Sequence, residues 1–285
     1  MAVRRMLGSV IRGAARLPLF TVVLGHPSVR ARLRDVPGFS NLYSNGWSFA
    51  HPFDRFYRIN TGAFVASEDL VSSPFDGGKP GFYAGSQPSI IRTALRTLPA
   101  LERFTFVDLG CGKGRPLIVA SEFGFRAIVG VELSESLATH ARRNAAVLRR
   151  RLPDRVPVRI ELHDASTYSY PDGDLVVFLY NPFPEVVVSK VIAQLESLLV
   201  FGGRRIFVVY YNPVHGHCFD ASAFFSRYFA ATLPYAIEEL GYGPDKDETV
   251  VIWQAGSKLR ARPGADIAIR VTTPDVRADL RVSPS

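Results

Sequence analysis

The stretch Phe106-Val-Asp-Leu-Gly-Cys-Gly-Lys-Gly-Arg115, followed by Val129-Gly-Val-Glu-Leu133, decides the fold of this chain. It overlaps an apolar run, Phe104 to Leu109, that is short, rich in β-branched and aromatic residues, and ended by glycines. Such a run is typical of a buried parallel strand. The three glycines can adopt positive φ, and without Cβ atoms they let a ligand approach the backbone closely. The stretch therefore predicts a strand that leads into a ligand-binding turn.

A helix and a second strand are expected after this turn. Pro116 to Phe123 predict a helix whose N-terminal N–H groups face the turn, where they can receive negative charge. Arg126 to Leu133 predict the second strand, which includes Glu132 near its end. This carboxylate lies 22 residues after Gly110, about where a β-α-β unit places the acid that binds the ribose hydroxyls of a nucleotide. The chain is therefore predicted to bind a cofactor that contains adenosine.

The position of the third glycine separates two kinds of nucleotide site. A dinucleotide fingerprint would place that glycine at position 115, whereas here it is Gly114. With this spacing the sequence resembles the class I S-adenosylmethionine-dependent methyltransferases, and among them a branch of poorly characterised bacterial members. The resemblance covers roughly residues 89 to 254, and it rests on Asp108-Leu-Gly-Cys-Gly-Lys-Gly114, Gly130-Val-Glu-Leu-Ser134, Asp164-Ala165 and Phe178-Leu-Tyr-Asn-Pro-Phe183.

The resemblance implies a cofactor, a reaction and a set of site residues. The cofactor is S-adenosyl-L-methionine, and the reaction is methyl transfer to an acceptor. Asp108 is assigned to the amino-acid end of the cofactor, Glu132 to its ribose and Asp164 to its adenine. The full set of implied cofactor-binding residues is Asp108, Gly110, Cys111, Gly112, Gly114, Glu132, Leu133, Asp164 and Ala165.

The segment Asn181-Pro-Phe-Pro184 is the candidate catalytic site. It is similar to a shortened Asn-Pro-Pro-aromatic loop of amino-group methyltransferases, in which the asparagine and the following carbonyl orient an acceptor amine. Here Phe183 follows Pro182 directly, so the second proline of that loop is missing. The resemblance implies catalytic roles for Asn181, Pro182 and Phe183, with an amine as candidate acceptor. The alternative is a strand stopped by proline, followed by a helix with Pro184 in its first turn.

Strands and helices alternate along the rest of the chain. The predicted fold class is α/β, with a doubly wound, seven-stranded mixed sheet of the class I methyltransferase (Rossmann-like) type. The sheet is expected to be mostly parallel with a C-terminal antiparallel hairpin. The further predicted strands are Val156–Leu162, Asp174–Tyr180, Arg205–Tyr211, and a hairpin of Tyr235–Gly241 with Glu248–Gln254. Helices are predicted to start near Pro88, after a Ser134 cap, after Pro184, and as a short segment over Ser222–Phe229.

Several residues near these strand ends have two interpretations. Asp164 is either an adenine ligand or a turn-forming residue. His215 and His217 could act as a general base, and with Cys218 they could suggest a metal site. No metal site is predicted, because a third well-spaced ligand class is not evident in the sequence. Cys111 is expected to be a small side chain tolerated in the turn rather than a nucleophile.

The net charge of +8 is unevenly distributed. Residues 1 to 100 carry 12 basic and 5 acidic residues, and residues 256 to 285 carry 6 and 3, which leaves 34−12−6 = 16 basic and 26−5−3 = 18 acidic residues between them. The central segment is therefore slightly acidic, so a nucleic-acid acceptor is not expected. The expected acceptor is a protein or a small molecule. Two cysteines give no disulfide framework, which predicts a cytoplasmic location.

The predicted organisation has four segments. They are a basic N-terminal extension over residues 1–35, an irregular lid or substrate region over 36–88, the methyltransferase domain over 89–255, and a loosely ordered tail over 256–285 with one strand near Ile267–Val271. Arginines and an apolar stripe within residues 1–34 allow three interpretations: peripheral membrane contact, a targeting peptide, or a helix packed on the domain. In the lid region, Phe53, Tyr57 and Tyr83 are candidate acceptor contacts, with packing against the sheet as the alternative.

Two other functional classes remain compatible with the sequence. A NAD-type oxidoreductase would share the sheet and the ribose acid, although the place of Gly114 and the terminal hairpin argue against it. A non-catalytic, methyltransferase-like binding module would share every motif named above.

Overall fold

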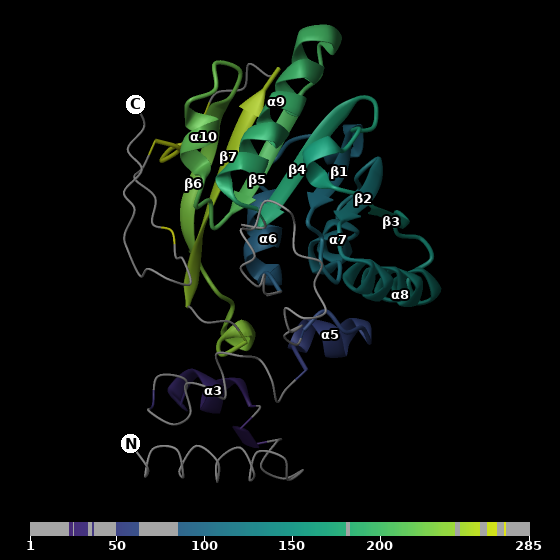
Figure 1. The fold of residues 1–285 in the computed structure, drawn as a ribbon. Helices are drawn as coiled ribbons and strands as arrows, with labels where there is room; N and C mark the ends of the chain where they lie inside the picture. Colours follow the sequence, from purple (N-terminus) through teal and green to yellow (C-terminus); the bar gives the residue numbers. More distant parts are fainter. Residues whose placement is uncertain are drawn as a thin grey trace.

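The computed structural model describes residues 23–24, 26–33, 36, 50–62, 85–180, 183–242, 246–256, 261–266 and 271. Their centre is a seven-stranded mixed sheet with the strand order β3-β2-β1-β4-β5-β7-β6, and Figure 1 shows the strands side by side in this order. The predicted fold class is confirmed.

The first five strands form the parallel part of the sheet. They are β1 (Phe104–Leu109), β2 (Ala127–Glu132), β3 (Val158–Leu162), β4 (Asp174–Tyr180) and β5 (Ile206–Tyr211). Two of them, β1 and β4, have the predicted bounds, and the other three begin one or two residues later than predicted. All six β1 residues are buried, as expected for a central strand covered on both faces.

The antiparallel hairpin is present, but one of its strands was predicted in the wrong place. β7 (Asp247–Ala255) pairs with β5, and its partner β6 is Ser226–Pro234. The helix predicted over Ser222–Phe229 is therefore wrong, and the strand predicted over Tyr235–Gly241 contains instead the 3-10 turn η4 (Ile237–Glu239). A register shift between Arg227 and Phe229 interrupts the two-residue period of β6, so that consecutive residues are buried there and imitate a helical pattern.

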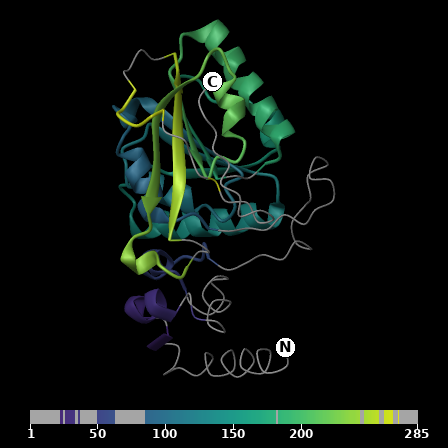
Figure 2. The same ribbon diagram turned by 90° about the vertical axis from the view of Figure 1, so that its left-hand side faces the viewer.

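Helices cover both faces of the sheet. One face packs against α6 (Pro88–Leu95), α7 (Arg115–Ala120) and α8 (Glu135–Arg151), and the other against α9 (Glu185–Gly202) and α10 (Gly216–Asp220). Figure 2 shows α9, in green, on the opposite side of the sheet from the blue helices. This doubly wound arrangement brings the turns that follow the parallel strands to one edge of the sheet.

Local sequence explains where the longer helices begin and end. Ser134 caps α8 as predicted, with its hydroxyl oxygen accepting a hydrogen bond from the Leu137 N–H. Helix α9 ends at Gly202 and is capped by Gly203, which has a φ of 56° and can adopt this left-handed conformation at little cost. Helix α7 is shorter than predicted, because the chain turns after Ala120.

Within its described residues, the segment before the domain contains the helices α3 (Pro27–Leu33) and α5 (Pro52–Tyr57). Inside the domain, the 3-10 turns η2 (Leu101–Arg103) and η3 (Ala165–Thr167) lie before β1 and after β3. Phe53 and Tyr57 of α5 are 6% and 4% exposed and belong to the core cluster on the α6 face. They pack against the domain, so their proposed acceptor contact is wrong and the packing alternative holds. Tyr83 lies outside the described residues.

Other predictions fall on residues that the structure does not describe. These are most of the arginine-rich segment 1–34, the 243–245 part of the hairpin turn, and the strand near Ile267–Val271 except for Val271 itself. The division of the chain into four segments stays a prediction. Within the described residues, no helix has the length and apolar character required to cross a membrane.

Packing at the centre of β2 leaves no room for a side chain at Gly130. An added Cβ would lie 2.5 Å from Leu117 Cδ1 and 2.8 Å from Cys111 Sγ. We expect Gly130→Ala to lower the free energy of unfolding by about 1–3 kcal/mol, the usual cost of overpacking a core. Denaturant unfolding measures the effect, with Gly124→Ala as the control, because an added Cβ there meets no atom within 4 Å. Equal stability of the two variants would contradict this packing.

Candidate cofactor and acceptor site

The proposed site residues follow the carboxyl ends of neighbouring parallel strands. The glycine turn follows β1, Glu132 ends β2, Asp164 follows β3, Asn181 follows β4 and Asn212 follows β5. Because the order of these strands is β3-β2-β1-β4-β5, their carboxyl ends, and with them the described positions among these five, lie along one edge of the sheet. In a doubly wound sheet this edge is where ligands bind.

The glycine turn has the predicted backbone conformation. Gly110, Gly112 and Gly114 have φ values of 73°, 54° and 84°, in the left-handed region that favours glycine. The N–H groups of Gly110 and Cys111 both donate to the Val131 carbonyl, at 2.9 and 3.0 Å, and so fix the turn to β2. Gly114 is the N-cap of α7, so the first turn of this helix starts at the glycine turn.

Glu132 is held against the glycine turn by backbone donors. Its Oε2 accepts from the Gly112 N–H at 2.8 Å and its Oε1 from the Ser134 N–H at 2.9 Å. The side chain is buried, and burial raises the pKa of its carboxyl although these hydrogen bonds oppose the shift. Both oxygens of a carboxylate can accept further hydrogen bonds, so Glu132 can still receive two hydroxyl groups from a ligand.

Asp108 is the most unusual polar residue of this edge. It is buried at 1% exposure, and its Oδ2 has no hydrogen-bond partner among the described residues. Burial raises the pKa of Asp108 well above its ordinary value, and the charge of nearby Glu132 raises it further. A buried acceptor without a donor costs about 1–3 kcal/mol, so this oxygen is suited to a donor supplied by a ligand.

Cys111 behaves as the sequence predicts. It is buried, and its Sγ lies under the turn close to Gly130. Burial and the acidic neighbours Asp108 and Glu132 raise the pKa of the thiol well above its ordinary value. The side chain therefore stays a neutral thiol that fills space, and it is not an activated nucleophile.

The adenine end of the predicted site lies between β2 and β3. Leu133 is 36% exposed, which leaves an apolar side chain available at the end of β2. Asp164 is the N-cap of η3, because its Oδ1 accepts from the Ser166 N–H at 2.7 Å. Its turn-forming role is thus observed, and adenine contact stays a prediction. Ala165 is buried in the cluster on the α9 face.

The predicted acceptor segment is described only in part. Asn181 and Pro182 lie outside the described residues, and Phe183 packs, partly buried, against the core cluster on the α9 face. The residue before them, Tyr180, is well fixed. Its ring stacks on that of Tyr211 with the centroids 4.4 Å apart, and its hydroxyl donates to Glu248 Oε1 at 3.2 Å.

Glu248, at the start of β7, links the ends of β4 and β5 through hydrogen bonds to their last residues. Its other oxygen, Oε2, accepts from the hydroxyls of Tyr211 and, at 2.5 Å, of Tyr235. Burial and the Glu248 charge raise the pKa of Tyr211 well above its ordinary value, so this hydroxyl stays a donor. Three tyrosines that share one buried carboxylate fix the ends of β4 and β5.

Sequence reasoning did not assign a role to Asn212, although a signal for it exists. Both β4 and β5 end in a tyrosine that is followed in the sequence by Asn-Pro, at 180–182 and 211–213, and the two tyrosines are paired in register. Asn212 has a φ of 48°, and its N–H donates to the Thr249 carbonyl at 2.8 Å. A left-handed conformation at a residue other than glycine is uncommon and is concentrated at functional sites.

A second missed feature ties the α5 segment to the glycine turn. Arg115, at the start of α7, donates to the Thr61 hydroxyl at 2.7 Å and to the Ser86 carbonyl at 3.1 Å. Lys113 Nζ donates to the Gly62 carbonyl at 2.7 Å. Thr61 and Gly62, which directly precede the undescribed residues 63–84, therefore lie beside the glycine turn.

The two histidines near the end of β5 face an acid from α9. His217 Nε2 lies 3.2 Å from Glu185 Oε1, and His215 Nδ1 lies 3.9 Å from Glu185 Oε2. Burial lowers the pKa of His215, whereas the hydrogen bond from His217 lowers the pKa of the exposed Glu185. Glu185 directly follows the segment Asn181-Pro-Phe-Pro184 and starts α9, and the histidines follow β5, so this group belongs to the same edge of the sheet.

Residues 106–203 match the family model described as a methyltransferase domain. This part of the chain is a methyltransferase domain. The matched residues begin in β1 and end with α9, so they include the glycine turn, Glu132 and the acceptor segment. This agrees with the resemblance on which the cofactor prediction rests.

Several solved methyltransferase structures are similar to this chain at low sequence identity. Magnesium protoporphyrin IX methyltransferase from Synechocystis PCC 6803, with bound S-adenosylmethionine, is 13% identical with a TM-score of 0.45, covering 80% of this chain and 96% of that chain. A putative tRNA (m1A22) methyltransferase from Streptococcus pneumoniae is 14% identical with a TM-score of 0.39, covering 61% and 71%. The putative methyltransferase yhhF from Escherichia coli is 16% identical with a TM-score of 0.41, covering 59% and 84%. A search of curated proteins found no match.

Proposed function

We propose that this methyltransferase binds S-adenosyl-L-methionine at the ends of β1 and β2 and transfers its methyl group to an amine held at the ends of β4 and β5. The observation that carries the proposal is the pair of buried carboxylates, Asp108 and Glu132, at a turn of three positive-φ glycines. Two buried acids raise each other's energy when both are ionised, and a cationic ligand relieves this.

The residues fit this cofactor. The unpartnered Oδ2 of Asp108 can accept from the ammonium group of the cofactor's amino-acid end. Glu132 can accept from both ribose hydroxyls while its backbone donors hold it in place. The absence of side chains at Gly110 and Gly112 lets the ligand approach the backbone. When bound, S-adenosylmethionine supplies a methyl group on a positively charged sulfur, which an acceptor lone pair can take with release of S-adenosylhomocysteine.

Little covalent machinery is required of the protein, because alignment of the reacting atoms supplies much of the rate. Asn181 would accept a hydrogen bond from the acceptor nitrogen and so direct its lone pair. The Tyr180–Tyr211 stack and Glu248 fix the end of β4, which directly precedes Asn181 in the sequence. An amine must be neutral to attack, so it must give up a proton before transfer.

The acceptor is proposed to be a small molecule or a protein rather than a nucleic acid, because the central segment carries more acidic than basic residues. Residues 1–34 would supply peripheral contact with an anionic membrane surface through their seven arginines.

The strand order also favours methyl transfer over a NAD-type reaction. β7 lies antiparallel between β5 and β6, whereas the strand order of dinucleotide-binding sheets is 3-2-1-4-5-6.

Calorimetry tests the cofactor first. We expect S-adenosylmethionine and S-adenosylhomocysteine to bind with a stoichiometry near one, and NAD not to bind. Incubation with labelled methyl donor and a cell lysate, fractionated into protein, nucleic acid, lipid and small molecules, then identifies the acceptor class. Label in primary or secondary amines of the protein or small-molecule fraction supports the proposal. Binding of NAD alone overturns the cofactor assignment, and label confined to nucleic acid overturns the acceptor assignment.

A further inference from the structure

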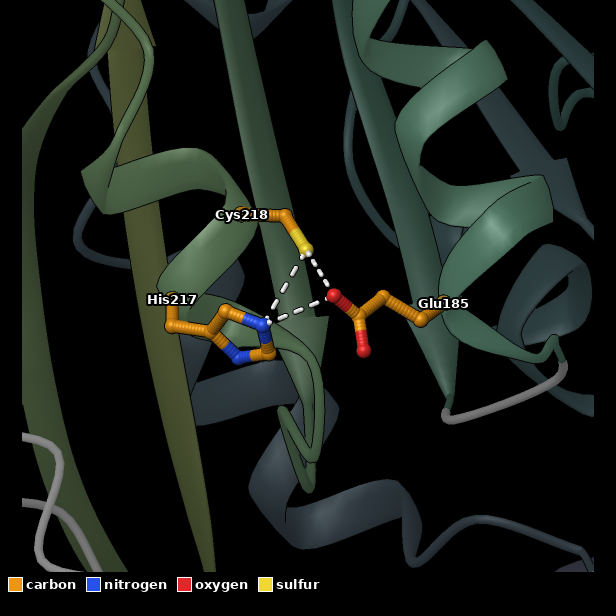
Figure 3. Close-up of side chains that lie close together, drawn as sticks. All are labelled: Glu185, His217 and Cys218. Atoms are coloured by element: carbon orange, nitrogen blue, oxygen red, sulfur yellow. Dashed lines mark hydrogen bonds and ion pairs between the residues drawn. The ribbon is translucent and has the colours of Figure 1, made fainter.

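Three side chains of different chemistry converge between α9 and α10. His217 Nε2 lies 3.2 Å from Glu185 Oε1, Cys218 Sγ lies 3.5 Å from the same His217 nitrogen, and Sγ lies 3.9 Å from the same Glu185 oxygen. Figure 3 shows the imidazole, the thiol and the carboxylate pointing at one another from the two helices.

An ion pair between Glu185 and His217 alone would not require a third polar side chain beside it. His217 and Cys218 are consecutive residues in α10, and side chains one residue apart on a helix normally point in different directions. Here both are directed at Glu185, which lies 32 residues before His217 in the sequence. A histidine–glutamate pair would not need the thiol within 3.5 Å of the imidazole nitrogen.

The spacing of the three donor atoms matches the ligand set of a tetrahedral metal. Zinc bonds of about 2.3 Å to sulfur and about 2.0–2.2 Å to nitrogen and oxygen place tetrahedral ligand atoms roughly 3.3–3.6 Å apart. The observed separations of 3.2, 3.5 and 3.9 Å require shifts of only a few tenths of an ångström. Thiolate, imidazole and carboxylate are also the donor types that zinc prefers over magnesium or calcium.

We propose that Glu185, His217 and Cys218 bind one zinc ion. The thiolate and the carboxylate together neutralise its two positive charges, and the thiol proton is released to solvent on binding. Three protein ligands leave the fourth position open, and the partial exposure of Glu185 and His217, with side chains 58% and 49% exposed, gives this position access to water. His215 flanks the carboxylate from its other side, with Nδ1 3.9 Å from Oε2.

The sequence alone could not support this site. His215, His217 and Cys218 are closely spaced and lack a distant ligand, so no metal was predicted. The fold supplies the missing ligand, because α9 starts after β4 and α10 after β5, two adjacent parallel strands. The site does not depend on the proposed cofactor or acceptor.

Metal binding is tested on the untagged full chain. After dialysis against a chelator, the protein is given excess Zn²⁺, the free metal is removed, and bound metal is measured by mass spectrometry. We expect about one zinc per chain. Titration with Co²⁺ should produce a thiolate-to-cobalt charge-transfer absorption, since Cys111 is buried and Cys218 is the accessible thiol.

Variants separate the metal site from an ion pair. Cys218→Ser should abolish the charge-transfer absorption, and Glu185→Gln should weaken Zn²⁺ binding roughly tenfold or more. His140→Ala is the matched control, because His140 is a half-buried histidine on α8, on the other face of the sheet, whose Nδ1 bonds to the Ser136 carbonyl of its own helix; metal binding by this variant should equal that of the wild type. S-adenosylmethionine binding by the same preparations reports on the cofactor site separately. Wild-type protein that retains no metal, or Glu185→Gln and Cys218→Ser variants that bind as the wild type does, would overturn the proposal.

Discussion

Replacement of Glu132 by alanine is expected to produce a large loss of cofactor binding. The carboxylate is buried, and its two oxygens already lie between the Gly112 and Ser134 N–H groups, so its position needs no reorganisation when a ligand arrives. Loss of hydrogen bonds to a charged group costs about 1.5–3 kcal/mol, which corresponds to roughly 10- to 100-fold weaker binding of S-adenosylmethionine. Calorimetry measures the change.

Two further variants show whether the effect is specific. Glu135→Ala removes an exposed acid three residues along, whose partners are Thr139 and Arg142 on α8, and it should leave cofactor binding unchanged. Glu132→Gln keeps an acceptor for one backbone N–H but loses the charge, so its affinity should lie between those of the wild type and Glu132→Ala. Wild-type affinity in a folded Glu132→Ala protein would refute the ribose assignment.

Local signals predicted the part of the fold that carries the cofactor turn. The run Phe104–Leu109 and the apolar centre of Asp174–Tyr180 are bounded by glycine and proline, and both strands have the predicted bounds. Their signals are strong because central parallel strands are apolar throughout and need no knowledge of a partner. β6 lacks such a signal. It is an edge strand with an irregular register, so its pattern depends on pairing with β7, which sequence periodicity does not reveal.

Contacts between distant segments explain what the sequence did not predict about the site. The glycines and Glu132 could be recognised because they follow one another within a single β-α-β unit. The unpartnered state of Asp108, the support of Tyr180 by Glu248, and the meeting of Glu185 with His217 each depend on side chains that lie far apart in the sequence. For Phe53 and Tyr57 the sequence instead predicted a ligand contact that the structure does not show. Aromatic residues in an irregular stretch are typical of binding loops, and only their burial shows that these two belong to the core.

Asp108→Asn is expected to change stability and cofactor affinity in opposite directions. In the folded protein without ligand, burial and Glu132 raise the pKa of Asp108 well above the value near 3.8 that it has when unfolded. The folded state therefore holds a proton that the unfolded state releases. The stability from this group is fully present below a pH of about 3.8 and is lost as the pH rises through the folded pKa. Asparagine cannot titrate, so the variant should lose less stability over this range.

The gain in stability comes with a loss of affinity. Without ligand at neutral pH, we expect Asp108→Asn to raise the free energy of unfolding by about 1 kcal/mol and the Tm by about 2–4 °C. Its affinity for S-adenosylmethionine should fall roughly 10- to 100-fold, because an uncharged amide no longer attracts the cofactor's ammonium group. Thermal unfolding from pH 4 to pH 8, with and without cofactor, measures both effects.

A variant at the opposite end of the sheet gives the matched control. Asp172→Asn changes a fully exposed aspartate that precedes β4, so it should alter neither the pH dependence of stability nor cofactor affinity. A purely structural role for Asp108 would give another result: its replacement would lower stability at every pH and leave the affinity of the folded fraction unchanged. A rise in stability together with weaker binding would therefore identify Asp108 as a residue that destabilises the ligand-free protein and contributes to binding of a cationic ligand.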